Sequence, residues 1–459
     1  MMRPGYLLLL LVGAMSGCMS LAPDYQRPPL AVAERWSAET SAAAQTLHWR
    51  QFFLDQNLQQ VIASALQHNR DLRVAAEAVL ASEALYRVQR AARVPGLSAE
   101  ANARHNREHG ADVDSEAVAH SYGAGLVMSG FELDLFGRVR SLSEAQWQTY
   151  LASAAGAQAT RISLIAATAT AYLNHAASSS LLTIAEDTRD STAKSLHLVS
   201  ARMRLGLAAR LDYSAVDTVH QQARADVARY RSQVEQARNA LQLLCGSQLD
   251  PALLAAGLEQ GGYTRQQLPV GLPSEVLLKR PDVQQAEHNL QARNASIGAA
   301  RAAFFPRISL TAQAGVSSTA FSELVSQPTR VLSLAPSLNL PLLDGGSNRA
   351  NLQYAESQQR SAIARYDQTL QSAFREVADL LAQQATLGEQ LQAQQAYVDS
   401  AASSLYIAQA RYRQGSDSYL DTLVAQRTLY AARQSLLATR LSDASSQVQL
   451  YAALGGGVE

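Results

Sequence analysis

Few residues in this sequence have the type and spacing that chemistry requires. His105 and His109 lie four residues apart, a spacing that lets two imidazoles share a metal ion when the segment is helical. They fall instead in a polar link between two predicted strands, close to several acidic residues, and we interpret this link as a solvated loop. Zinc-protease, nucleophile-elbow, P-loop and dinucleotide-binding motifs do not occur. We therefore expect no enzymatic activity, no metal site and no cofactor.

The two cysteines, Cys18 and Cys245, have different expected roles. Residues 1–17 carry one early cation, Arg3, then an apolar run and small residues, which is typical of a secretory signal peptide. The run ends in Met15-Ser16-Gly17-Cys18, a pattern similar to a bacterial lipobox, so we expect Cys18 to be lipidated. The alternative is a plain signal with an incidental cysteine. Cys245 is expected to be a small buried apolar residue without a disulfide.

The composition excludes several other classes of protein. The chain has 459 residues with 39 basic and 39 acidic side chains, so it lacks the positive excess that nucleic-acid binding needs. No apolar run long enough to span a bilayer follows the signal, which excludes a bundle of membrane-spanning helices. Only 17% of the residues are charged while 47% are apolar. The composition does not exclude contact with a membrane by other means.

Two long stretches of the chain are expected to form helices. No proline lies between Pro95 and Pro251, and none follows Pro341, so both stretches avoid the residue that breaks helices. Apolar residues also recur with the seven-residue period of a coiled coil. In the second stretch this lattice includes Ile363, Leu370, Val377, Leu391, Val398, Leu405 and Tyr412. We predict one long helix pair at about 139–245 and another at about 347–455.

The two long stretches are copies of one another. Ala201–Gly206 matches Ala410–Gly415 at an offset of 209 residues, and the match continues through the turns that follow. The offset drifts by only a few residues over the rest of the chain, as expected for a duplicated unit with small loop insertions. We therefore predict a first structural repeat at 18–245 and a second at 246–459.

Each copy also contains a pair of predicted strands. Apolar and polar residues alternate with period two through about 307–341, and a noisier alternation occupies about 97–136. Ser129-Gly130 shifts the phase of that alternation, so we predict a β-bulge there. Strands with one apolar side are typical of outer-membrane barrels, but single-chain barrels have at least about eight strands and this chain offers four. Because lipid tolerates only closed barrels, we expect several chains to pool their strands.

Motifs spread over essentially the whole chain resemble those of the TolC family of outer-membrane factors. They are Ala22–Pro28, Phe131–Arg138, Gly271–Glu275, Arg280–Val283, Phe304–Ile308, Leu340–Gly346 and Arg411–Gly415. Each motif alone is weak evidence for this family, whereas the whole set of motifs is specific to it. With the lipobox, the chain is most similar to the lipoprotein branch of that family, which serves drug-efflux pumps.

The resemblance implies a mainly α-helical homotrimer with a small β part. Three chains would build a 12-stranded transmembrane β-barrel, four strands from each, and their long antiparallel helical hairpins would form an α-barrel in the periplasm. Shorter segments near 50–65 and 247–280, and the C-terminus, would surround it as a belt. The implied location is the bacterial outer membrane, with a lipid anchor. The implied partners are a periplasmic adaptor and a proton-driven inner-membrane pump of the RND type.

The turns of the two helical hairpins are the candidate functional site. Gly206 and Gly415 end long helices where the backbone needs a positive φ, and Leu211 and Leu420 open the return helices. In the family that the chain resembles, these turns meet the adaptor and close the duct when it is idle. The implied adaptor contacts are Gly206, Leu211, Asp212 and Gly415. The implied aperture residues are Leu420, Asp421, Asp417, Arg411, Arg413 and Arg427.

Two details of the aperture assignment are open at this point. Efflux relatives often carry a carboxylate one turn after the apolar ring, and this chain has Val424 there. We therefore predict that Leu420 closes the aperture with charge contacts from Asp421 and Arg427. Ordinary helix caps and solvated charges are the alternative for each of these residues.

The sequence is compatible with three functions. The first is a passive exit duct for small hydrophobic or amphipathic compounds, driven by its partner pump. The second is the outer-membrane duct of a type I protein secretion system. The third is a structural coiled-coil lipoprotein without a pore, which leaves the four amphipathic strands without a role. The lipobox favours efflux over secretion, on the basis of the family resemblance.

Overall fold

The computed structural model describes residues 20–36, 48–109, 116–258, 262–264 and 274–457, and they form two compact units. The described residues of the sheet unit lie within Met1–Pro29, Glu77–Ala154 and Gln285–Asp367. Those of the hairpin unit lie within Leu30–Ala76, Ala155–Gln284 and Gln368–Glu459. Each unit therefore takes segments from both halves of the chain. Cys18 lies outside the described residues.

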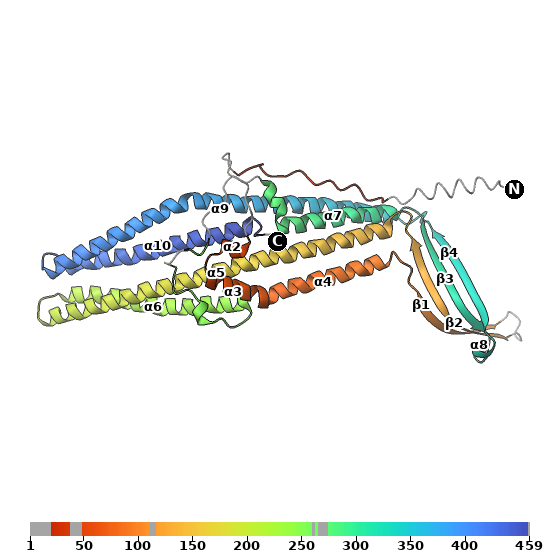
Figure 1. Cartoon of the computed structure of the whole chain (residues 1–459), viewed down its shortest axis with the longest axis horizontal. Coiled ribbons are helices and arrows are strands. Elements are labelled where there is room, and N and C mark those ends of the chain that lie inside the picture. The colour runs from red at the N-terminus through yellow and green to blue at the C-terminus, as the bar shows by residue number, and fades with distance from the viewer. Residues whose placement is uncertain (1–19, 37–47, 110–115, 259–261, 265–273, 458–459) are drawn as a thin grey trace. The chain divides into compact units, whose positions relative to one another are not determined.

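The sheet unit contains a four-stranded antiparallel sheet in the order β1-β2-β3-β4 (Figure 1). Its strands are β1 (Ser98–His109), β2 (Glu116–Leu133), β3 (Arg307–Ser318) and β4 (Thr329–Asn339), and the short helix α8 (Glu323–Ser326) lies between the last two. The register shifts between Met128 and Phe131, and Gly130 has φ 58°. The predicted bulge is thus confirmed, at the residue type that tolerates this backbone conformation.

The register places apolar side chains on one face of the sheet. Ala312 stands opposite Leu334, and Ala314 stands between Leu126 and Leu332. The opposite face is polar, as illustrated by Ser309 and Ser337, whose hydroxyls lie 2.7 Å apart. Within the described part of the chain, β1 and β4 each pair on one side only. The sheet therefore has one apolar face and two open edges.

The prediction that His105 and His109 lie in a link between strands is wrong. Both residues belong to β1, whose pairing with β2 continues from Ser98 opposite Val127 to His109 opposite Glu116. The ladder is held by backbone hydrogen bonds. It therefore continues through polar residues, where the sequence no longer shows an alternation of apolar side chains.

Long helices make up most of the remainder of the chain (Figure 1). They are α4 (Arg70–Ala91), α5 (Arg138–Arg204), α6 (Arg210–Cys245), α7 (Pro281–Ala302), α9 (Ser347–Arg413) and α10 (Tyr419–Ala453). The expected pair of long helical hairpins is confirmed as α5–α6 and α9–α10. Among the described residues, no helix combines the length and apolarity needed to cross a bilayer.

Carboxylates fix the points where strands give way to long helices. Asp134 accepts hydrogen bonds from the N–H groups of Val139 and Arg140, at 3.0 and 2.8 Å, and so caps α5. Asp344 caps α9 in the same way, through the N–H of Asn348 at 2.8 Å. Hydrogen bonds from the backbone lower the pKa of Asp344. These caps explain why both copies carry an Asp just before a long helix.

The core of the hairpin unit is formed where short segments pack on the long helices. The short segments are α2 (Trp49–Phe52), α3 (Gln56–His68) and the 3-10 helices η1 (Pro251–Leu253) and η2 (Ser274–Lys279). Phe52 stacks on Tyr451, with ring centroids 4.6 Å apart, and both are buried. Cys245 is confirmed as a buried apolar residue, and burial raises the pKa of its thiol to about 11.

Candidate functional site

The two hairpin turns have the same backbone geometry. Gly206 has φ 71° and Gly415 has φ 79°. The N–H of Leu207 donates to the carbonyl of Arg202 at 2.8 Å, and the N–H of Ser416 donates to the carbonyl of Arg411 at 3.1 Å. Both turns are Schellman motifs, which require a left-handed residue. The predicted positive φ at both glycines is confirmed.

An Asp at the third position of each return helix accepts a local hydrogen bond. In α6, Asp212 accepts from the N–H of Ala209 at 3.1 Å. In α10, Asp421 accepts from the hydroxyl of Ser418 at 2.8 Å. A carboxylate in the first turn also lies favourably in the field of the helix dipole. Within one chain, Asp212 therefore satisfies a backbone N–H at the start of α6, whereas Asp421 bonds to the side chain of the residue that precedes α10.

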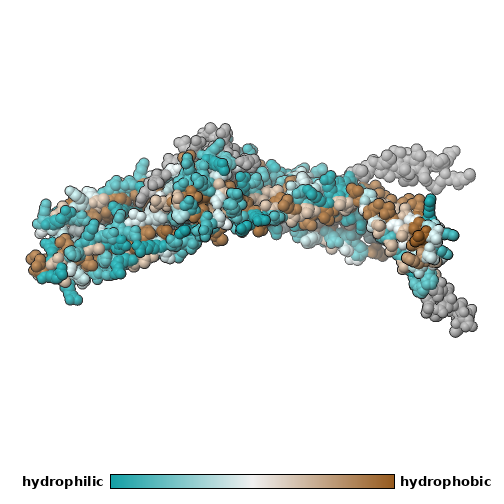
Figure 2. Space-filling model, turned by 60° about the horizontal axis from the view of Figure 1, so that its bottom comes forward, coloured by the Kyte–Doolittle hydropathy of each residue, from teal (hydrophilic) through white to brown (hydrophobic). Residues whose placement is uncertain are grey.

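Exposed leucines surround both turns. In the first turn, Leu205, Leu207 and Leu211 expose 74%, 68% and 78% of their surface. In the second, Leu420 exposes 58% and Val424 exposes 56%. Figure 2 shows hydrophobic colour at the turn end of the helices, on the left of the view. More than half of the surface of each of these side chains is exposed in one chain, so it can contact another protein.

The arginines of the predicted aperture behave differently from one another. Arg411 pairs with Asp417 across the turn, with Nε 3.0 Å from Oδ2. Arg413 and Arg427 are exposed, and neither makes an ion pair within the described ranges of the chain. The structure thus brings Arg411 and Asp417 together, whereas Asp421 bonds to Ser418 and not to Arg427.

An aromatic cluster next to the turns was not predicted as part of the site. The guanidinium of Arg202 lies 4.9 Å from the ring centroid of Tyr412, and that ring meets Tyr419 edge-on at 5.0 Å. Tyr419 packs with Val199 and Leu423, and burial raises the pKa of its phenol. This cluster joins α5 to the second turn. The usable signal was the heptad position of Tyr412, close to a second tyrosine beyond the turn.

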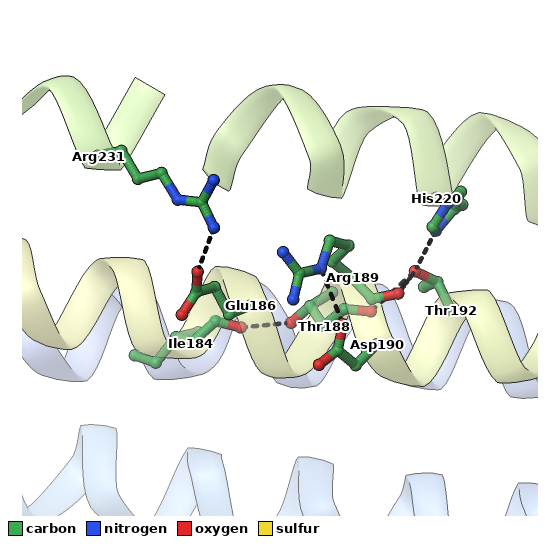
Figure 3. Close-up of polar contacts among 8 residues, drawn as sticks. All are labelled: Ile184, Glu186, Thr188, Arg189, Asp190, Thr192, His220 and Arg231. Atoms are coloured by element: carbon green, nitrogen blue, oxygen red, sulfur yellow. Dashed lines mark hydrogen bonds and ion pairs between the residues drawn. The ribbon is translucent and has the colours of Figure 1, made fainter. Parts of the chain in front are cut away.

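Polar contacts connect α5 and α6 further along the first hairpin (Figure 3). Glu186 accepts from Arg231 at 2.8 Å, and the hydroxyl of Thr192 lies 3.2 Å from Nδ1 of His220. Arg189 donates to the neighbouring Asp190 at 2.8 Å, which lowers the pKa of that carboxyl. The first two contacts tie α5 to α6, the third lies within α5, and no nucleophile or group of metal ligands converges among these residues. No cluster of three or more metal-ligating side chains occurs among the described residues.

The N-terminal strap, defined here as residues 20–29, is bound to α7 in the sheet unit. Arg27 donates to both carboxylate oxygens of Glu287, at 2.8 and 3.0 Å, and the Tyr25 hydroxyl donates to the same carboxylate at 3.1 Å. Asn294 donates to the carbonyl of Pro23 at 2.7 Å. The strap begins two residues after Cys18, so these contacts hold the chain close to the predicted lipid site. The motif Ala22–Pro28 is visible in the sequence, whereas its partner Glu287 is not.

Comparison with known proteins gives consistent results. A family model described as outer membrane efflux protein matches residues 61–247 and again 272–456, which confirms the internal duplication. The chain is 43% identical to the probable efflux pump outer membrane protein TtgC of Pseudomonas putida, over 96% of this chain and 93% of that protein. It is also 43% identical to outer membrane protein OprJ of Pseudomonas aeruginosa, over 98% and 95% of the two chains.

Solved structures agree with the relatives found by sequence. A membrane protein from Pseudomonas aeruginosa superimposes with a TM-score of 0.90 at 42% identity, over 96% of this chain and 98% of that one. The open state of the Neisseria gonorrhoeae MtrE outer membrane channel gives 0.87 at 36% identity, over 96% and 99%.

Proposed function

The chain belongs to the outer membrane efflux protein family, and we propose that three copies of it form the exit duct of a tripartite efflux pump. The chain itself is the outer-membrane component of such a pump.

The unpaired edges of the sheet support the proposal that several chains share one barrel. One face of the sheet is apolar, and β1 and β4 have unpaired outer edges within the described part of the chain. Backbone groups in lipid need partners, so an open edge there must meet another strand. Four strands are too few to close alone, since the smallest single-chain barrels have about eight. Pairing β4 of one copy with β1 of the next satisfies every edge.

The surface of α4 supports the same assembly. None of its residues, all of which the structure describes, is buried in a single chain. Leu80, Leu85 and Val88 expose 57%, 60% and 70% of their surface. A helix with exposed apolar residues is stabilised when neighbouring helices cover them. A ring of helices from three chains would do so.

Relatives indicate the class of compound that passes through the duct. Their names refer to toluene, solvent and antibiotic efflux pumps. We therefore propose small hydrophobic or amphipathic compounds as the cargo. Export is passive in this chain and driven by a proton-coupled inner-membrane pump of the RND type. A periplasmic adaptor would dock on the exposed leucines of the turns.

The test is export in a bacterium that lacks its own outer-membrane duct but keeps a pump and adaptor. The chain should restore efflux of an amphipathic fluorescent dye, and its mass in detergent should equal three chains. Leu211→Asp should abolish efflux because it places a charge in the adaptor contact, while Leu211→Met should not. Failure to restore dye efflux, together with rescue of polypeptide export by an ATP-driven exporter, would favour the secretion alternative.

The lipid anchor is tested separately. Mass spectrometry of the purified chain should find acyl groups on Cys18 and no residues 1–17. A Cys18→Ala variant should lack that added mass and still assemble, because the strap is held by Glu287. An unmodified Cys18 would contradict the lipidation proposal without affecting the exit duct.

The proposed gate consists of Leu420 with charge contacts from Asp421 and Arg427 of neighbouring chains. Arg427 is free of ion pairs within the described part of one chain, so it is available to an adjacent copy. The double variant Asp421→Ala, Arg427→Ala should raise single-channel conductance in planar bilayers. Arg87→Ala, which removes an exposed pair with Glu83 on α4, serves as the control. Unchanged conductance in the double variant would refute this gate.

A further inference from the structure

A cleft of about 380 Å³ lies in the sheet unit, where the strands give way to helices. The strap, the end of α4, the start of α5 and α7 all contribute to its lining. Arg93 lies between the end of α4 and the start of β1, and Arg140 lies in the first turn of α5, shortly after β2 ends. The cleft, called here the α4–α5 cleft, is therefore located at the base of the sheet.

The position of the α4–α5 cleft places it beside lipid headgroups. Its location at the base of the sheet sets it at the membrane surface, and the inference rests on the proposed insertion of the sheet into the outer membrane. Ser20 of the strap also lines the cleft. Two residues of extended chain reach about 7 Å at most, so a lipid attached to Cys18 would enter the membrane close by.

One end of the cleft is basic. Arg93 is exposed and makes no ion pair within the described ranges of the chain. Arg140 is only loosely paired with Asp134, since its Nε lies 3.5 Å from Oδ2. Guanidinium groups bind phosphate oxygens through several N–H donors at once. This end of the cleft is therefore suited to a phosphate group.

The other end of the cleft is suited to a cation. Glu144 lies one helical turn beyond the arginine of α5, on the same face of the helix, and it is exposed. Trp147 lies a further turn along, with its ring centroid 5.0 Å from that of Tyr86 in α4. Aromatic faces attract ammonium groups. The carboxylate accepts a hydrogen bond from Gln148 at 2.8 Å, which leaves its other oxygen for a ligand.

A buried hydroxyl in the cleft lacks a partner. Ser141 lines the cleft and is 3% exposed, and its Oγ has no hydrogen-bond partner in the described part of the chain. Such a group is unfavourable unless a bound molecule satisfies it. We propose that the cleft binds the headgroup of a phospholipid that carries both a phosphate and a primary ammonium, namely phosphatidylethanolamine. The phosphate contacts Arg93 and Arg140, and the ammonium contacts Glu144 and Trp147.

The experiment measures the lipids that the full-length protein retains after extraction from liposomes with equal amounts of phosphatidylethanolamine and phosphatidylglycerol. Native mass spectrometry of the wild type should show phosphatidylethanolamine preferred about 5-fold, as expected for one partly exposed ion pair. Glu144→Gln should abolish this preference, because only the ammonium contact is lost. Arg93→Gln should reduce the retention of both lipids about 5-fold. Arg90→Gln, at an exposed position of α4 outside the cleft, is the matched control and should behave like the wild type.

The outcomes separate this site from general contact with the membrane. Equal retention of the two lipids by the wild type would overturn the proposal, and so would a preference that survives Glu144→Gln. Each variant is scored only in preparations that have the mass of three chains. A wild-type trimer that exports dye but does not prefer phosphatidylethanolamine would overturn this inference alone, whereas loss of trimer and of dye efflux would count against the proposed function.

Discussion

At the residue scale, the side chains of Tyr25 and Arg27 in the N-terminal strap share one buried carboxylate, that of Glu287. Glu287 exposes 8% of its side chain, whereas its partner Arg27 exposes 51%. Burial is the main cause that raises the pKa of Tyr25, and the neighbouring Glu287 carboxylate adds to it. Because the carboxylate is buried, the loss of one of its hydrogen bonds costs more stability than the loss of an exposed ion pair.

Arg27→Ala should destabilise the sheet unit by about 1–3 kcal/mol, since it leaves a buried carboxylate with fewer donors. The free energy would be measured by denaturant unfolding, and cleavage within residues 20–29 by limited proteolysis. Arg87→Ala, which breaks an exposed pair on α4, should change stability by less than about 0.5 kcal/mol. Equal effects of the two variants would argue against a specific role of the strap.

The buried His175 of α5 predicts a pH dependence of stability. Burial lowers its pKa, and its Nδ1 has no hydrogen-bond partner among the described residues. The folded state therefore keeps it neutral, while the unfolded chain binds a proton near pH 6.5. Stability is unaffected above that pH and falls as the pH drops from about 6.5 toward the lowered native value. Thermal unfolding between pH 7.5 and 5.5 should show a smaller fall in His175→Gln, and a wild-type fall in His197→Gln.

At the scale of elements, local pattern and tertiary contact contribute differently. The long helices follow from the absence of proline, the heptad period and the glycines at both turns, all of which act over one or two helical turns. Alternating apolar residues predict the strands. The pattern does not predict the outer end of β1 at His105 and His109, because pairing with β2, and not an alternation of side chains, extends the strand there.

Paired glycines let β2 and β3 approach closely. Gly125 stands opposite Gly315, and a Cβ at Gly125 would lie 2.6 Å from the carbonyl oxygen of Ala314. Gly125→Ala should therefore destabilise the sheet by about 1–3 kcal/mol, observed as a lower Tm. Gly388, inside α9, provides the control, because a Cβ added there would meet no atom within 4 Å. Gly388→Ala should stabilise by about 0.5–1 kcal/mol, and a lower Tm there would contradict this account.

At the scale of the whole molecule, membrane contact is assigned to one face of the sheet. Leu334 lies on the apolar face, opposite Ala312, and its neighbour Ser333 lies on the polar face, opposite Gln313. Leu334→Arg should impair folding into liposomes, since a cation facing lipid costs about 2–4 kcal/mol at the bilayer centre. Ser333→Arg should fold like the wild type, because it faces the lumen. The reverse order of folding yields would invert the proposed orientation of the barrel.

Several properties of this protein were determined by the sequence alone. They are the two long hairpins, the four strands with their bulge at Gly130, the duplication and the positive φ at Gly206 and Gly415. Each follows from the periodicity or conformational preference of residues close together in the chain, or from similarity between its two halves. These signals can be read from the sequence without knowing which distant segments of the chain contact one another.

Only the tertiary structure decided which distant residues are partners. Glu287 receives Arg27 from 260 residues away, and His120 meets His105 from across a hairpin. The carbonyl of Ala453 accepts a hydrogen bond from Arg280 at 2.7 Å, which anchors the end of α10. Hydrogen bonds and ring contacts act over a few ångströms and carry no periodic trace in the sequence. They become visible only when the fold brings their partners together.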